Sequence, residues 1–192
     1  MSKSEQLTKL YSAYKNEFLN EEIVLGDGNP DSRLLLIGEA PGKDEVNQSR
    51  PFVGMAGKNL AEFLGILGID RQLLYITNTI KYRLSQLNGQ TGRAVNRPAT
   101  KNDIAINREY LLNEIDIIKP EYIVTLGNVP LKAVTGDYKS SVGRVHGQLA
   151  EIECLALKYH LFPLYHPASI IYNASLKTSY IEDIERLRGI IG

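Results

Sequence analysis

The sequence predicts an α/β protein, a three-layer α/β/α sandwich around a central, mostly parallel sheet of four strands. Two observations predict this class. Four short apolar runs each end in a compact polar or glycine cluster, which is typical of buried parallel strands. The segments between these runs carry apolar residues at three- and four-residue spacing, which is typical of helices that pack on a sheet.

A helix and a turn precede the first strand. The spacing of Leu7, Leu10 and Tyr14 predicts a helix over residues 4–19. A segment rich in glycine, asparagine and aspartate then leads into the first strand, the apolar run at 34–37.

The next segment connects the first strand to the second. Residues 43–56 are expected to form a long loop, and Gly57 is expected to open a helix. The apolar stripe that includes Leu60 and Phe63 marks the buried face of this helix, which Gly68 ends.

The middle of the chain contains the second strand and a polar insertion. The strand is expected at 73–77, and the polar, glycine-containing residues 84–99 predict a mobile loop. A helix follows over 101–118 and stops before Pro120.

Two more strand and helix units complete the fold. A strand at 121–126 leads to Asn128, expected as the N-cap of a short helix. A strand at 159–164 is followed by a terminal helix from about Ser175. No repeat or linker interrupts the pattern, so the full 192 residues are expected to form one domain.

Composition restricts the environment and the partners. The 22 lysines and arginines balance 22 aspartates and glutamates, so a polyanion-binding surface must come from local clustering. The N-terminal residues are too polar for a signal peptide or a membrane span. The single cysteine, Cys154, excludes an internal disulfide and a multi-cysteine metal site, so a reducing cytoplasm is the expected location.

Four chemically distinct residues follow the four predicted strands. They are Glu39, Asn78, Gly127 and His166. Because open α/β sheets bind ligands beyond the carboxyl ends of their strands, we expect these residues to converge on one cleft.

The motifs that contain these residues resemble the uracil-DNA glycosylase superfamily, and most closely its family-four branch. The motifs are Gly-Glu-Ala-Pro-Gly at 38–42, Arg-Pro-Phe-Val-Gly at 50–54, Ile-Thr-Asn at 76–78 and Tyr-His-Pro-Ala at 165–168. The similarity runs from about residue 22 to the C-terminal helix. It implies a DNA-repair hydrolase that flips a uracil out of DNA and cleaves its N-glycosidic bond, leaving an abasic site.

The resemblance also implies a base pocket. Phe52 would stack on the base, and Asn78 would read the edge of the uracil with its amide. Gly38, Ala40 and Gly42 would also belong to the substrate-binding site. Without the resemblance, Phe52 would be interpreted as a core aromatic and Asn78 as a turn cap.

The same resemblance assigns the catalytic groups. His166 would lie near O2 of the uracil, where negative charge grows as the base departs. Glu39 would orient water or stabilise the cationic sugar, although by itself it also fits a solvated loop acid. Many superfamily members have an aspartate in place of Ala40, where it can activate water. Without that base, stabilisation of the leaving group must account for more of the lowering of the activation barrier here.

The chain departs from the family at its metal ligands. Family-four enzymes typically hold a four-iron, four-sulfur cluster on four cysteines, and the matching positions here are Tyr11, Tyr14, Tyr82 and Asn107. Such a cluster needs thiolate ligands, so no cluster is expected, and the chemistry requires no metal or other cofactor. The rings and the amide are expected to fill the volume and to hydrogen-bond to one another.

Local charge and the resemblance predict the DNA contacts. The candidate cations are Lys81, Arg83, Arg93, Arg97 and Lys101. Backbone N–H groups at the helix starts Gly57 and Asn128 are further candidates, and so is a wedge formed by Ser169, Ile170 and Ile171. The alternatives are a solvated loop for the cations and inward packing for the wedge.

The 84–99 segment weakly resembles the insertion of UdgX-type relatives, which attach covalently to DNA through a histidine. Asn96 falls near that histidine, and asparagine is not a competent nucleophile, so turnover is expected. We therefore expect a monomeric glycosylase that acts on uracil-containing DNA, with base-excision repair enzymes as downstream partners. A catalytically inactive nucleic-acid-binding relative and an enzyme for free nucleosides or nucleotides are the alternatives.

Overall fold

The structure, a computed structural model, describes residues 1–169, 173 and 175–192. Among these residues, six strands form the central sheet in the order β1-β3-β2-β6-β8-β7. Their bounds are β1 Asp27–Gly28, β2 Leu34–Gly38, β3 Tyr75–Asn78, β6 Tyr122–Leu126, β7 Ala150–Cys154 and β8 Leu157–Leu164.

The four interior strands are parallel, as the sequence predicted, and correspond to its four apolar runs. The predicted count of four strands is wrong for the whole sheet, because the antiparallel strands β1 and β7 extend its two edges. Both escaped prediction for physical reasons. β1 has only two residues, and β7 exposes most of its side chains and lacks a continuous apolar run.

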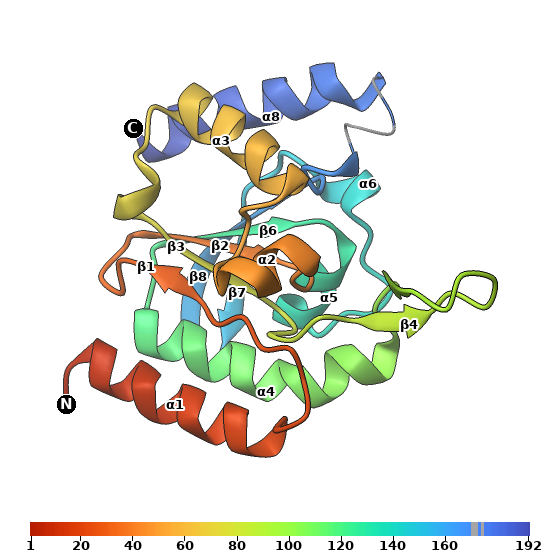
Figure 1. Ribbon diagram of the computed structural model, residues 1–192. Coiled ribbons are helices and arrows are strands. Elements are labelled where there is room, and N and C mark those ends of the chain that lie inside the picture. Colours follow the sequence, from red (N-terminus) through yellow and green to blue (C-terminus); the bar gives the residue numbers. More distant parts are fainter. Residues whose placement is uncertain (170–172, 174) are drawn as a thin grey trace.

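Helices cover both faces of the sheet, which confirms the mixed α/β class (Figure 1). Helices α1 (Lys3–Glu17), α4 (Lys101–Ile118) and α5 (Asn128–Thr135) lie on one side, and α3 (Met55–Leu67) and α8 (Ser175–Ile191) lie on the other. Strand β2 shows why both faces need cover. Its side chains alternate between two hydrophobic clusters, with Leu35 and Ile37 in one and Leu34 and Leu36 in the other.

Helix boundaries differ from the predicted ones mainly in the loops that follow strands β2 and β6. Helix α2 (Lys43–Gln48) occupies part of the expected 43–56 loop. Helix α3 starts at Met55 with Gly54 as its N-cap, one half-turn before the expected Gly57. Helix α5 is capped by Gly127, so Asn128 is its first helical residue and not its cap. Two short elements, a 3₁₀ turn (Arg71–Leu73) and α6 (Val142–Val145), complete the described helices.

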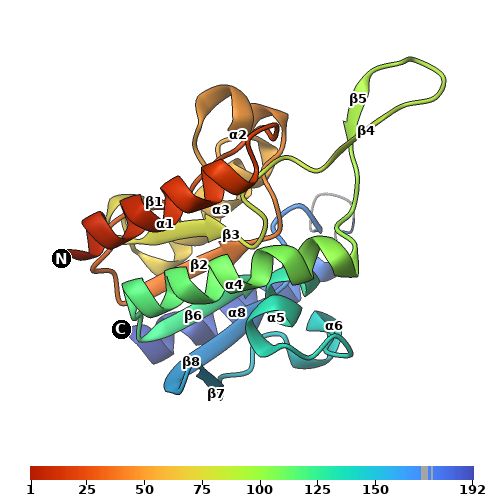
Figure 2. The ribbon, with the colours of Figure 1, turned by 90° about the horizontal axis from the view of Figure 1, so that it is seen from below.

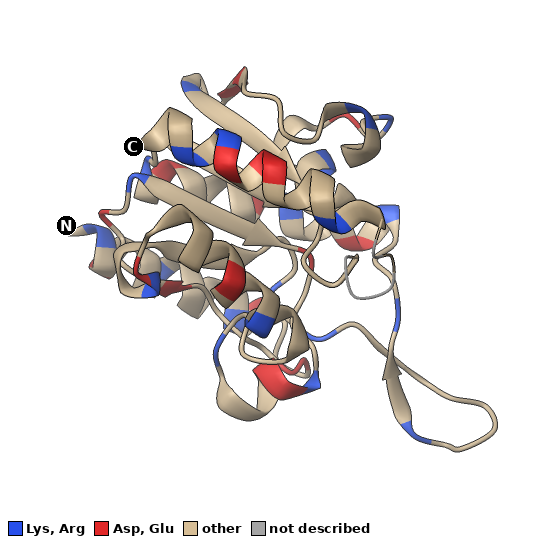
Figure 3. Ribbon diagram, turned by 90° about the horizontal axis from the view of Figure 1, so that it is seen from above, with Lys and Arg blue, Asp and Glu red and all other residues tan. Residues whose placement is uncertain are grey.

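The polar insertion forms a hairpin instead of a structureless loop. Strands β4 (Ser85–Leu87) and β5 (Ala94–Asn96) pair in an antiparallel ribbon. This hairpin projects from the body of the molecule in Figures 2 and 3, and all six strand residues are exposed. Its tip is closed by Asn88, whose side chain accepts hydrogen bonds from the backbone N–H groups of Gln90 and Thr91. We call residues 85–96 the arm.

None of the helices in the described part of the chain is both long and apolar enough to cross a membrane.

Candidate active site

A cleft of about 350 Å³ opens beyond the carboxyl ends of the parallel strands. Its lining includes five predicted site residues: Ala40, Gly42, Phe52, Asn78 and His166. The other lining residues were not predicted as site residues: Lys43, Asp44, Glu45, Gly54, Met55, Ala56, Asn96 and Ala168. Glu39 lines an adjoining cavity of about 170 Å³, and Ala40, Asn96 and His166 border both spaces. The structure therefore brings the predicted residues together at one place.

Gly38 allows the base-pocket residues to approach the end of strand β2. It lies beside Asn78 in the sheet register. A Cβ atom at Gly38 would lie 2.4 Å from the Asn78 Oδ1 atom and 2.5 Å from the Cζ atom of Phe52. Any side chain here would displace one of these two groups, so the glycine is required by close packing and not by a turn.

Phe52 is held in an uncommon backbone conformation at the edge of the cleft. Its φ angle is +52°, which is costly for a bulky residue unless neighbours fix it. Glu45 supplies one restraint, because its Oε1 atom accepts the N–H groups of Val53 at 3.1 Å and Gly54 at 2.8 Å. Arg71 supplies another by donating to the carbonyl oxygen of Phe52 at 3.2 Å. The buried face of Phe52 is therefore fixed before any ligand binds.

Glu45 and Arg71 are structural supports that sequence reasoning missed. Glu45 also accepts the Gly42 N–H through Oε2 at 3.1 Å, so one carboxylate joins two segments of the pocket wall. Arg71 donates a second bond to the carbonyl of Pro51. Nothing in the local sequence marks either residue, since each acts on backbone groups of another segment.

The imidazole of His166 is partly buried and neutral at physiological pH. Burial lowers the pKa of His166 to about 4, despite an opposing effect of the Glu45 carboxylate. The Nδ1 atom accepts the backbone N–H of Ala168 at 3.1 Å, which places the ring proton on Nε2. A neutral imidazole with an Nε2–H can donate a hydrogen bond without carrying charge into the cleft. Its ring is stacked with Phe52 at a centroid distance of 6.1 Å.

Asn78 presents an amide to the cleft from the end of strand β3. The residue is buried, and its carbonyl oxygen accepts a bond from the Lys81 ammonium at 3.1 Å. Within the described residues, its side-chain amide makes no hydrogen bond. A buried amide that lines a cleft is suited to a ligand that offers both a donor and an acceptor.

Glu39 lines the cavity that adjoins the cleft, and one of its carboxylate oxygens is held by a hydrogen bond. Its Oε1 atom accepts the backbone N–H of Ala99 at 3.2 Å. Burial raises the pKa of Glu39, and the Ala99 N–H partly offsets this rise by stabilising the carboxylate. This carboxyl is therefore not the solvated loop acid of the alternative interpretation.

Two predicted DNA contacts are wrong. Lys81 is completely buried and pairs with Glu114 at 2.8 Å, so its ammonium cannot reach a phosphate. Gly57 is buried inside helix α3, and its N–H donates to the Gly54 carbonyl at 2.9 Å. A Cβ atom there would lie 2.2 Å from the Phe52 carbonyl oxygen, so this glycine serves the packing of the pocket.

The remaining predicted DNA contacts differ in accessibility. Asn128, Arg93 and Lys101 are exposed. Arg83 pairs with Glu22 and Arg97 with Asp103, so both guanidinium groups already have partners within the chain. Ser169 follows the His166 motif and donates its N–H to the His166 carbonyl at 2.8 Å. The expected wedge residues Ile170 and Ile171 lie outside the described residues.

The four residues that the family resemblance matches to iron–sulfur ligands form hydrogen bonds to neighbouring side chains. Tyr14 donates to the Asn107 amide oxygen at 2.5 Å, and the Asn107 nitrogen donates to the Tyr82 hydroxyl at 3.3 Å. Tyr11 lies apart from these three and bonds to Tyr75 and Glu114. The donors are neutral oxygens and an amide, and packed rings fill the space, so the residues present do not fit a cluster that requires four thiolates.

No group of three or more histidine, cysteine, aspartate or glutamate side chains is arranged for metal binding in the described part of the chain.

Comparisons with known proteins agree with the motifs. Residues 25–187 match the family model described as the uracil DNA glycosylase superfamily. The type-4 uracil-DNA glycosylase of Sulfurisphaera tokodaii is 36% identical over 169 residues, which cover 86% of this chain and 73% of that protein. The type-4 uracil-DNA glycosylase of Thermotoga maritima is 36% identical over 171 residues, which cover 88% of this chain and 83% of that protein. The protein of the same name from Archaeoglobus fulgidus is 32% identical over 172 residues, or 88% and 82% of the two chains.

Proposed function

The chain belongs to the uracil-DNA glycosylase superfamily, and from that membership we propose that it hydrolyses the N-glycosidic bond of uracil in DNA and leaves an abasic site. One observation carries the assignment to this cleft. Phe52, Asn78 and a neutral His166, from distant parts of the sequence, line a single space of about 350 Å³.

Base recognition would use an apolar face and an amide. A uracil flipped from the helix can stack on the fixed ring of Phe52. The Asn78 amide can donate to a uracil carbonyl and accept from its ring N–H, a pairing that cytosine reverses. Gly38 supports both contacts, because only a glycine lets Phe52 and Asn78 approach so closely.

Bond cleavage would depend on leaving-group stabilisation by His166. As the C1′–N1 bond breaks, its electron pair moves to the base and negative charge gathers at O2. The Nε2–H of a neutral imidazole can donate a hydrogen bond to that oxygen. This hydrogen bond becomes stronger as negative charge develops on O2. Such a donor stabilises the transition state more than the bound substrate.

Glu39 would act on the sugar side. A carboxylate there can stabilise the positive charge of the sugar and orient the water whose oxygen bonds to C1′. One proton of that water remains on the new hydroxyl and the other reaches the departing base. Since Ala40 provides no second carboxylate, no stronger base is available from that position.

DNA would reach the cleft along the arm. Between Asp70 and Asp103 the sequence contains no aspartate or glutamate, and Figure 3 shows only cationic and uncharged residues on the arm. Arg93 is exposed on the arm, Lys101 is exposed at the start of α4, and Asn96 joins the base of the arm to the cleft. These features suit contact with phosphates beside the flipped nucleotide, with Asn128 and Ser169 as further candidates.

A labelled oligonucleotide with a single uracil tests the proposal. We expect strand scission after alkali, in the presence of EDTA, and none with thymine at the same position. Absence of cleavage with retained DNA binding would favour the inactive relative. Release of uracil from free deoxyuridine at a comparable kcat/KM would favour the enzyme for free nucleosides.

A further inference from the structure

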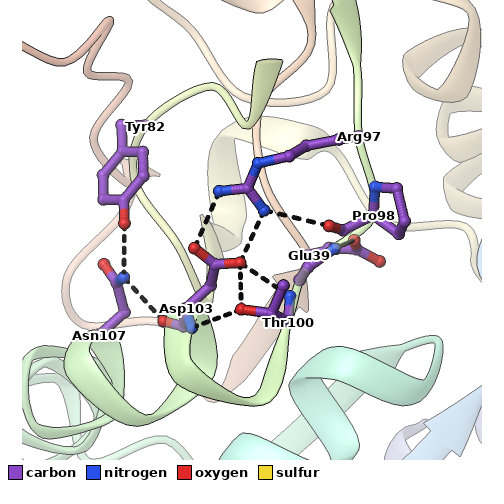
Figure 4. A network of polar contacts seen from close by, with 8 residues as sticks. Glu39, Tyr82, Arg97, Pro98, Thr100, Asp103 and Asn107 are labelled. Carbon is purple, nitrogen blue, oxygen red and sulfur yellow. Dashed lines mark hydrogen bonds and ion pairs between the residues drawn. The ribbon is translucent and has the colours of Figure 1, made fainter. Parts of the chain in front are cut away.

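We propose that Arg97 and Asp103 are positioning residues for Glu39, acting through the backbone of Ala99. The inference rests on the proposed function, because it assigns a task to groups that adjoin the same cleft. Figure 4 shows the network, which runs from the interior of helix α4 to the Glu39 carboxylate.

The first step is the bond between Ala99 and Glu39. The backbone N–H of Ala99 is the donor to the Oε1 atom of Glu39, at 3.2 Å. Ala99 lies between the arm and helix α4, in a segment that belongs to neither a helix nor a strand. No ladder of backbone bonds fixes this donor, so its position depends on the residues around it.

The second step is the convergence of both flanks of Ala99 on one carboxylate. On one side, the Arg97 guanidinium makes two bonds to Asp103, at 2.7 and 3.0 Å. On the other side, the backbone N–H and the hydroxyl of Thr100 each donate to Asp103 at 2.7 Å. Arg97 also donates to the carbonyl of Pro98 at 3.2 Å. The segment is thereby held at both ends around Ala99.

The third step is the anchoring of Asp103 itself. Its own N–H donates to the Thr100 hydroxyl at 3.1 Å, which completes a capping box at the start of α4. Its carbonyl accepts the buried Asn107 amide at 2.9 Å, and Asn107 contacts Tyr82 and Tyr14. The Arg97 guanidinium holds the pKa of Asp103 well below its usual range, so the carboxylate stays ionised. The side chains of Asn107, Tyr82 and Tyr14 therefore support the segment that holds Glu39.

A role in capping helix α4 would by itself also account for the Arg97–Asp103 pair, so the test must separate the positioning of Glu39 from the stability of the fold. The charged and titratable groups that border the cavity of Glu39 are Arg97 and His166. The readout is the titration of Glu39, followed by the ¹³C shift of its carboxyl and by the ¹H shift of the Ala99 amide. Glu39→Gln assigns the carboxyl signal.

In the parent chain, we expect the Ala99 amide shift to follow the protonation of Glu39 with the same midpoint. In Arg97→Gln and Asp103→Asn, the Ala99 shift should lose this dependence and the Glu39 midpoint should rise, because the carboxylate loses its donor. The kcat/KM on the uracil oligonucleotide should fall about tenfold, the value of a hydrogen bond to a charged group. Ser2→Ala, which removes the capping box of α1, is the stability control and should leave both shifts unchanged.

Unchanged Glu39 midpoints in both folded variants would overturn the proposal. Arg97→Gln keeps the Thr100–Asp103 capping box, so it remains informative if Asp103→Asn fails to fold. An inactive parent that shows the coupled titration would contradict the proposed function while supporting the positional link. An active parent without the coupling would contradict this inference alone.

Discussion

His166 differs from the other two histidines because its ring lines the cleft and its Nδ1 atom accepts a backbone N–H, which leaves the ring proton on Nε2. Replacing it with alanine removes the proposed donor to O2 while leaving the stacking face and the base-reading amide. We predict that His166→Ala lowers kcat roughly 10²–10³-fold, the usual loss for one oxyanion donor, with little change in KM. Single-turnover cleavage of the uracil oligonucleotide measures this. His160→Ala, a substitution in the interior of strand β8, is the control.

The pH dependence of kcat/KM follows from the surroundings of His166. Because the neutral ring is the active form and its pKa is about 4, kcat/KM should stay flat from pH 8 to pH 6. An ordinary histidine would titrate across that interval. The rate should fall only in more acidic solution, where His166 gains a charge and Glu39 loses one. A profile with a midpoint near 6.5 that disappears in His166→Ala would contradict the burial argument.

The low pKa of His166 also makes the free energy of unfolding depend on pH. The unfolded chain binds a proton at His166 near pH 6.5, whereas the folded chain binds it near pH 4. Between these values the unfolded state holds more protons, so the free energy of unfolding decreases as the pH falls through this window.

At the scale of elements, the arm is the feature that the sequence described least well. An isolated two-stranded ribbon is marginal in water, and this one is tied to the body at its base by Arg83–Asn96 and Arg97–Asp103. Its strands contain serine, glutamine and asparagine, which carry no strand signal. By contrast, the helix expected near 101–118 is confirmed, because an apolar stripe marks its buried face and Pro120 marks its end.

The site was predictable where a strand end and a motif coincide, as at Asn78 and His166. It was not predictable where the partner is distant in sequence. The local sequence predicts a surface cation at Lys81, yet Lys81 pairs with Glu114, which lies on the buried stripe of α4 beside Leu111 and Ile115. A carboxylate on a buried stripe requires a cation, and that signal was available.

The arm also carries a prediction at this scale. Arg93→Gln should weaken binding to uracil-containing DNA and lower the dependence of log Kd on log salt by about one unit, with kcat nearly unchanged. The reason is that the substitution removes one contact to a DNA phosphate and leaves the residues that act on the glycosidic bond unchanged. Arg188→Gln, in the last turn of α8, is the matched control. Equal salt slopes for the two variants would show that the arm does not contact DNA. Binding titrations at several salt concentrations measure this.

At the scale of the whole molecule, one buried polar cluster joins the sheet to the helices of one face. Glu114 of α4 bonds to Lys81 at 2.8 Å and to Thr77 of β3 at 3.1 Å, and its other oxygen accepts the hydroxyl of Tyr11 from α1. Tyr11 in turn contacts Tyr75 of β3 at 2.6 Å. Strand β3 delivers Asn78 to the cleft, so the same cluster that joins the layers also supports the base-reading strand.

This cluster predicts where the fold is most sensitive to a single change. Glu114→Gln leaves the Lys81 ammonium fully buried without its counter-charge, which should lower the free energy of unfolding by about 3–5 kcal/mol. Replacing both residues with apolar ones of similar volume should cost much less, because no charge then remains buried. The exposed pair Lys158–Glu151 is the control, and Lys158→Ala should change stability by less than about 1 kcal/mol. Urea denaturation of the variants measures all three. If Glu114→Gln lowered the free energy of unfolding as little as Lys158→Ala, water would have to reach the Lys81 ammonium. The buried cluster would then not be what joins the sheet to the helices.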